Sequence, residues 1–126
     1  MNTVDDEPHF LDDPLQVYVS MLHTLPPLTR EEEIDCIQHV RAGDEQAQVS
    51  RKRLFEANLL LVVPIAERYQ NARIHVLDLI VKGNETLEQS LQTLSDISGD
   101  ALRAYVAERI ESAIAAAAGS APPQFL

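Results

Sequence analysis

The stretch from residue 54 to residue 84 holds the densest apolar pattern of the chain and constrains the fold most. Within it, apolar side chains recur at intervals of three and four residues: Leu59, Val62, Val63, Ala66 and Tyr69. This spacing places them on one face of a helix. A second apolar run, Leu77, Ile80 and Val81, follows the polar residues 70–75 and predicts another helix that starts just before Asp78. The stretch therefore predicts two helices of a bundle core.

Helix boundaries can be predicted from capping signals. Asp13 supplies a capping carboxylate and Pro14 follows at the first helical position. Thr29 and Glu32 have the spacing of a capping box, and Gly43 is a natural C-terminal stop for that helix. Asp44 and Asp100 are predicted caps of later helices. Further helices are expected at residues 45–57, 59–70, 78–94 and 100–118.

Two residues are predicted to interrupt the apolar stretch. Asn58 falls where the helix at 45–57 should bend or break before the next one. Pro64 lacks the N–H that would bond to the carbonyl of Leu60, and in a helix interior this costs about 3 kcal/mol. A kink is therefore expected at Pro64, while Gly83 should weaken its helix locally.

The other predicted helices carry apolar stripes of their own. Those expected to face the core are Leu15, Tyr18, Val19, Leu22, Ile34, Ile37, Val40, Leu54, Leu79, Leu87, Leu91, Leu94, Leu102, Val106, Ile110 and Ile114. No strand pattern is present. The sequence predicts an all-α compact bundle of about five to six helices, formed by residues 12–118 as a single domain, with flexible tails at 1–11 and 119–126.

Composition argues against several classes of function. The chain has 20 acidic and 10 basic residues, and this net charge of -10 opposes unassisted binding to a phosphate backbone. Arg51, Lys52 and Arg53 form the only basic cluster, which an exposed helix face explains equally well. Cys36 is the only cysteine and the four histidines lack ligand spacing, so neither a metal site nor a cofactor is expected.

Catalysis and membrane insertion are not expected either. The sequence shows no nucleophile–base pair and no Gly-rich phosphate loop, so we do not expect an enzyme. The acidic N-terminus is unlike a signal peptide, and the longest apolar run is too short to span a bilayer. A soluble, cytoplasmic protein is the expectation.

The order and spacing of many residues resemble the bacterial sigma-70 family of RNA polymerase initiation factors. The matching residues are Asp13-Pro14, Tyr18, Leu28-Thr29, Glu31-Glu32-Glu33, Ala42-Gly43-Asp44, Glu56-Ala57-Asn58-Leu59, Leu61-Val62-Val63, Ile65-Ala66, Arg68-Tyr69, Asn71, Leu77-Asp78-Leu79-Ile80 and Gly83-Asn84. The resemblance divides the domain into residues 12–57, similar to region 1.2, and residues 58–118, similar to region 2.

The resemblance implies two activities for such a domain. One helix docks on a coiled coil in the clamp of the polymerase β′ subunit, which needs a complementary polar surface. The next helix opens the promoter −10 element by capturing flipped bases on aromatic rings and holding phosphates with basic residues.

The residues for promoter opening are largely replaced. Where the family has Phe, Tyr, paired Trp and Arg, this chain has Leu102, Tyr105, Glu108-Arg109 and Glu111. Residues 85–118 contain six acids and two bases, a net charge of -4. Each stacked base contributes about 1–3 kcal/mol, so losing most of the rings should abolish capture. Asn58, Tyr105 and Arg109 remain as residual DNA-facing candidates, although a helix bend explains Asn58 and a half-buried structural position explains Tyr105.

The candidates for polymerase docking are Asp78, Val81, Lys82, Asn84 and Glu88. Val81-Lys82 stands where the family usually has Gln-Glu, and a Glu-to-Lys reversal against a basic clamp weakens a close contact. Structural roles are open alternatives: Asp78 can cap a helix, and Asn84 can link helices in the interior.

Two functional hypotheses follow. The first is a truncated sigma-like domain that binds core polymerase or one of its regulators and meets DNA only weakly or within the polymerase complex. The second is a helical interaction or dimerisation module that kept this fold for another partner, possibly a second copy of itself.

Overall fold

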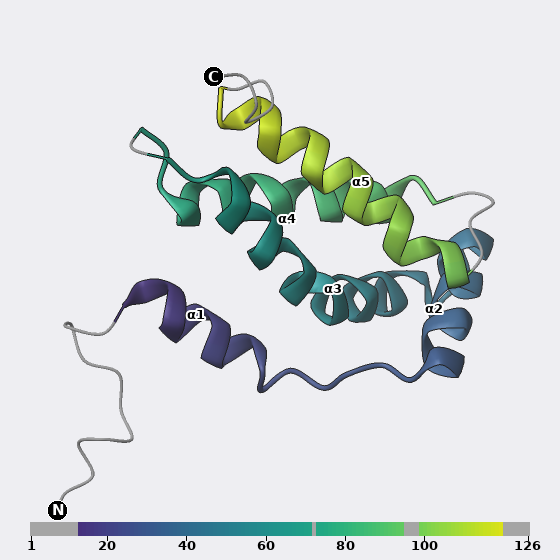
Figure 1. Cartoon of the computed structure of the whole chain (residues 1–126). Helices are drawn as coiled ribbons and strands as arrows, with labels where there is room; N and C mark the ends of the chain where they lie inside the picture. Colours follow the sequence, from purple (N-terminus) through teal and green to yellow (C-terminus); the bar gives the residue numbers. More distant parts are fainter. Residues whose placement is uncertain (1–12, 72, 95–98, 120–126) are drawn as a thin grey trace, which may run out of the picture.

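The described part of the chain consists of α-helices joined by short connections. A computed structural model describes residues 13–71, 73–94 and 99–119, and these residues contain no strand. They form five helices, α1 (Pro14–Leu22), α2 (Arg30–Ala42), α3 (Ala47–Tyr69), α4 (Val76–Gln92) and α5 (Gly99–Ala117) (Figure 1). The prediction of an all-α helical bundle is confirmed. The proposed tails lie almost wholly outside the described residues.

The helix signals near the N-terminus act as the sequence predicts. The Asp13 carboxylate accepts a hydrogen bond of 3.0 Å from the backbone N–H of Leu15, directly before Pro14 opens α1. At the start of α2, Thr29 Oγ1 accepts from the N–H of Glu32 at 3.1 Å, and the Glu32 carboxylate accepts from the N–H of Thr29 at 2.9 Å. Gly43 ends α2 with φ at 64°, in the left-handed region where glycine has no Cβ penalty.

Of the bend or break predicted at Asn58, the break is wrong, because α3 is one helix from Ala47 to Tyr69, and the bend stays a prediction. The buried Asn58 amide donates a hydrogen bond of 2.7 Å to the Leu54 carbonyl one turn earlier, so its polar group is accommodated inside the helix. α3 also continues through Pro64, which lies on the exposed side together with Leu60. Water can therefore reach the side of the helix where the proline N–H is missing. The kink expected at Pro64 stays a prediction.

Several predicted boundaries shift by about one helical half-turn. α3 begins at Ala47, after a turn in which Asp44 accepts from the N–H of Gln46 at 2.9 Å. α4 begins at Val76, because His75 Nδ1 accepts from the N–H of Leu77 at 3.0 Å and caps the helix. The alternative role of Asp78 as a cap is therefore wrong.

The ends of the last two helices also differ slightly from the prediction. α4 ends at Gln92, two residues before the expected position. α5 begins at Gly99, and the cap expected from Asp100 lies outside the described side chains. Gly119 follows α5 with φ of 72°, in the left-handed region that glycine favours.

α3 is the central helix, and it contacts each of the other four. α4 and α5 pack against α3 and against each other, α2 lies against α3 and α5, and α1 lies to one side (Figure 1). The stripe of Leu102, Val106, Ile110 and Ile114 on α5 is fully buried, as its four-residue spacing predicts. Ile34 is an exception: it is 36% exposed, while Cys36 takes an interior place on α2.

Gly83 allows α4 to approach its neighbours closely. A Cβ added at Gly83 would lie 2.5 Å from Val62 Cγ1 on α3 and 3.0 Å from Ile114 Cδ1 on α5. Only a hydrogen fits at this point without repacking. Gly83 therefore serves the close packing of three helices, and its low helix propensity is the cost of that contact.

None of the described helices combines the length and the apolar character needed to cross a membrane.

The side chains of His39, Asp35 and Asp44 lie together near the end of α2, with His39 Nδ1 2.7 Å from Asp44 Oδ2 and His39 Nε2 3.5 Å from Asp35 Oδ2.

Candidate functional site

The exposed face of α4 carries most of the docking candidates from the sequence. Asp78, Val81, Lys82, Glu85 and Glu88 recur at three- and four-residue intervals and are all exposed, because the opposite face of α4 is apolar and buried. We call these five residues the α4 ridge. Its apolar member, Val81, is 57% exposed.

The charges of the α4 ridge are mixed. Asp78, Glu85 and Glu88 are acidic and Lys82 is basic, with Lys82 Nζ 4.0 Å from Glu85 Oε1. A contact at this distance between exposed groups is weak. Lys82 and Glu85 are therefore held together only weakly.

Asn84 does not belong to the α4 ridge. Its amide nitrogen donates a hydrogen bond of 3.1 Å to the Tyr18 hydroxyl on α1, and its Oδ1 is buried and has no partner among the described residues. The structure therefore places Asn84 as a polar link between α1 and α4. The sequence had left this role open beside a partner contact.

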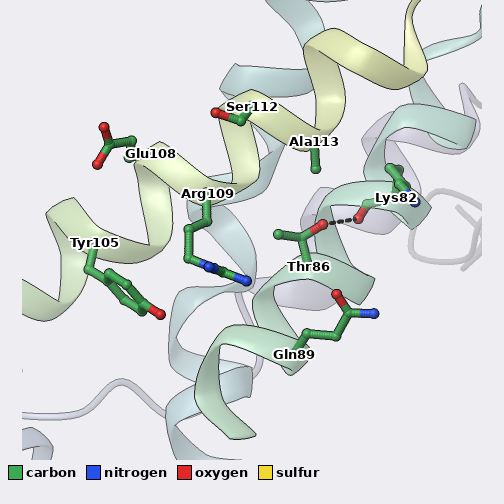
Figure 2. A pocket seen from close by; sticks show the side chains of 8 residues that line it. All are labelled: Lys82, Thr86, Gln89, Tyr105, Glu108, Arg109, Ser112 and Ala113. Atoms are coloured by element: carbon green, nitrogen blue, oxygen red, sulfur yellow. Dashed lines mark hydrogen bonds between the residues drawn. The ribbon is translucent and has the colours of Figure 1, made fainter. Parts of the chain in front are cut away.

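A shallow groove of about 560 Å³ runs between α4 and α5 (Figure 2). It is lined by Lys82, Thr86, Gln89, Tyr105, Glu108, Arg109, Ser112 and Ala113. Figure 2 shows Arg109 directed towards α4 and Glu108 pointing away from the groove.

Tyr105 and Arg109 are both engaged in the contact between α4 and α5. Arg109 Nε donates a hydrogen bond of 2.8 Å to the hydroxyl of Ser90, which is fully buried on α4. The guanidinium carbon of Arg109 also lies 5.6 Å from the centre of the Tyr105 ring. Tyr105 is half-buried against the core. Tyr105 and Arg109, the two DNA-facing candidates on α5, are therefore engaged in contacts within the chain.

Asn58 is not brought together with Tyr105 and Arg109. It is only 2% exposed and lies inside α3, so it does not line the groove between α4 and α5. The three residual DNA-facing candidates therefore do not form one surface.

Glu111 makes a contact that sequence reasoning did not find. Its carboxylate accepts from Arg68 Nη2 at 3.0 Å and from the Tyr69 hydroxyl at 2.8 Å, joining α5 to the end of α3. The hydrogen bond to Glu111 raises the pKa of Tyr69, and partial burial acts in the same direction. The partners are more than 40 residues apart in sequence, so helical spacing carries no signal for this contact.

No cluster of three His, Cys, Asp or Glu side chains suited to a metal ion occurs within residues 13–71, 73–94 and 99–119. Cys36 is buried, and burial raises the pKa of its thiol. This thiol is therefore held in its neutral, unreactive form.

The chain is similar in sequence to known bacterial RNA polymerase sigma factors. The chain is 39% identical over 104 residues to RNA polymerase sigma factor SigA of Clostridium acetobutylicum. It is 34% identical over 104 residues to the SigA proteins of Lactococcus lactis subsp. cremoris and of a Bacillus species. The chain is homologous to the bacterial sigma-70 family.

Each alignment to these sigma factors covers 82% of this chain but only 27% to 29% of the relative. The chain thus spans less than a third of the length of the sigma factors it matches. No family model matches it.

Proposed function

We propose that this chain is a sigma-like domain that binds RNA polymerase core through the α4 ridge and does not capture promoter DNA. The support for docking is the outward position of the α4 ridge on a bundle related to sigma factors. By the resemblance, the coiled coil of the β′ clamp is the expected partner. Val81 is 57% exposed among charged side chains and offers a partner an apolar contact at the centre of the ridge.

The support for loss of DNA capture is the state of α5. Capture of unpaired bases needs exposed rings and nearby cations. Among the described residues, the exposed side chains of α5 include no aromatic ring, Tyr105 is half-buried, and Arg109 is bonded to Ser90. Glu108 is exposed on α5 and adds negative charge where phosphates would have to pass.

Binding to core polymerase, or to its isolated clamp helices, tests the docking proposal. We expect retention of the chain at micromolar concentration, weaker retention of Asp78→Ala, and a change of the opposite sign for Lys82→Glu if the clamp is basic. Gln38→Ala, an exposed change on α2, is the matched control and should bind normally. Absence of binding at micromolar concentration by the unchanged chain contradicts the proposal.

A gel shift with the unpaired non-template strand of a promoter tests the second half of the proposal. We expect no shifted band for the chain alone. We also expect that its polymerase complex does not hold the strand through α5. A tightly held strand that is released by Tyr105→Ala would contradict the loss of capture.

Self-association is the second candidate function. The observation that favours it is the same exposed Val81, which offers an apolar contact to a second copy. Light scattering distinguishes the two: a dimer that Val81→Glu converts to a monomer supports this candidate. A strict monomer that binds core polymerase supports the first.

A further inference from the structure

The basic cluster of the sequence lies beside a second groove, which shares only Glu88 with the α4 ridge of the proposed function. Arg51, Lys52 and Phe55 recur at helical spacing on α3, and they face Glu88 and Leu91 of α4. The groove between them has a volume of about 240 Å³. It lies on the side of α4 that packs against α3, whereas the groove of Figure 2 lies on the side next to α5.

Arg51 has an unsatisfied donor at this groove. Its Nε is buried, and no hydrogen-bond acceptor for it occurs among the described residues. A buried guanidinium N–H without an acceptor is costly, more so than a neutral donor. No ion pair of Arg51 is present in the part of the chain that the structure describes, although Glu88 lines the same groove. An acceptor from outside the chain would remove this cost once the guanidinium turns towards the groove.

The charges around the groove select the kind of acceptor. Arg51 and Lys52 are positive and Glu88 is negative, so the lining itself carries one net positive charge at neutral pH; Lys52 also contacts Glu56 at 4.0 Å, which leaves Arg51 as the main cation of the groove. A ligand with a single negative charge neutralises it, whereas a phosphate dianion would leave an excess of negative charge beside Glu88 on an already acidic protein. Arginine also matches the planar, two-oxygen geometry of a carboxylate.

The other residues that line the groove determine which kind of carboxylate fits into it. The half-buried Phe55 ring and the fully buried Leu91 provide an apolar wall, and the amides of Gln48 and Gln92 complete the lining. The volume equals that of about eight water molecules at roughly 30 Å³ each, which limits the occupant to about the size of a single ring. We propose that this groove binds a small monocarboxylate with an aromatic or branched apolar body, held by Arg51.

Titration of the full chain with benzoate, followed by ¹H–¹⁵N NMR of the arginine Nε–Hε signals, tests this assignment. The Arg51 signal is identified by its loss in Arg51→Lys. We expect it to shift saturably with benzoate and to stay in place with benzamide, the uncharged analogue of the same shape. Arg51→Lys keeps the positive charge but loses the paired donors, and should weaken benzoate binding about tenfold.

Two further variants make the outcome decisive. Arg103→Lys, an exposed change on α5, should leave benzoate binding unchanged. Glu88→Gln should tighten it, because a competing negative charge is removed. No saturable shift with benzoate, an equal shift with benzamide, or stronger binding of inorganic phosphate than of benzoate would each overturn the proposal.

Discussion

Glu111 shows how a single position can change from a binding residue to a structural one. The resemblance to sigma factors places an arginine at this position, where it faces DNA phosphates. Here the carboxylate turns to its own chain, accepting hydrogen bonds from Arg68 and Tyr69 at the end of α3. The residue that stands in place of that arginine therefore fastens α5 to the bundle.

Replacing Glu111 with alanine should lower the free energy of unfolding by about 1 kcal/mol. The hydrogen bond from Tyr69 and the ion pair with Arg68 are both lost, and the partial exposure of these groups keeps the effect small. Urea denaturation measures it. Glu108→Ala, an exposed change one turn earlier on α5, is the control and should leave stability unchanged.

The same variant should also return the pKa of Tyr69 towards its ordinary value. Glu111 raises this pKa, so the folded protein keeps the Tyr69 proton at a pH where the unfolded chain loses it. The stabilisation is therefore complete below the unfolded pKa of about 10 and is lost as pH rises through the folded pKa. Titration of tyrosine absorbance should show one group that titrates earlier in Glu111→Ala, and identical curves would contradict the assignment.

His39 should make stability depend on pH near neutrality. The hydrogen bond to Asp44 raises the pKa of His39, and His39 in turn lowers the pKa of Asp44. The contribution of His39 is complete below the unfolded histidine pKa of about 6.5 and is lost as pH rises through the raised value. The contribution of Asp44 is present above its unfolded pKa and lost as pH falls through the lowered value.

The pair therefore stabilises most between these two limits, in weakly acidic solution. Unfolding curves across the neutral range should show stability that falls with rising pH, and Asp44→Asn should flatten this slope. His23, an exposed histidine bonded to the Val19 carbonyl, provides the control substitution His23→Gln, which should leave the slope in place. An unchanged slope in Asp44→Asn would contradict the assignment.

At the scale of the element, the errors of sequence reasoning have identifiable causes. A bend or break was expected at Asn58, yet its amide bonds to Leu54 one turn back and the helix continues. Asp78 was the proposed cap of α4, and His75 caps the helix instead. In both cases the decisive contact is a local hydrogen bond whose geometry depends on side-chain rotamers, and residue spacing does not encode it.

Gly83 gives the sharpest test of packing against helix propensity. An alanine in an exposed helix interior is favoured over glycine by about 1 kcal/mol. At Gly83 the added methyl would meet Val62 and Ile114, so Gly83→Ala should destabilise the protein by roughly 1–3 kcal/mol despite that gain. Gln89→Ala, an exposed position on the same helix, should be nearly neutral. Thermal unfolding of both variants decides it, and a stabilised Gly83→Ala would show that the helices can separate at little cost.

At the scale of the whole molecule, the aliphatic pattern carried most of the prediction. The fully buried stripe on α5 and the helix starts at Asp13 and Thr29 are both encoded by local spacing, and both are confirmed. The candidate site was only partly predictable. Four of its five docking residues share the exposed face of α4, but the inward turn of Asn84 depends on Tyr18, 66 residues away. Long-range polar contacts of this kind leave no periodic signal in a single sequence.

The acidic balance of the chain predicts a response to salt. With a net charge of -10, the folded state repels itself, and screening relieves this repulsion. The unfolding temperature should rise by a few degrees between low and physiological ionic strength. Scanning calorimetry at both salt concentrations measures the change, and a fall in unfolding temperature would mean that attractive ion pairs outweigh the net charge.

The unbroken course of α3 has a consequence for inheritance. The boundary at residues 57 and 58, which the resemblance to sigma regions suggests, falls in the middle of this helix. Half of α3 is too short to be stable in water without the other half. Recombination between related genes at that point would join two mismatched halves of α3, the helix that contacts all the others. We therefore expect residues 12–57 and 58–118 to be inherited together.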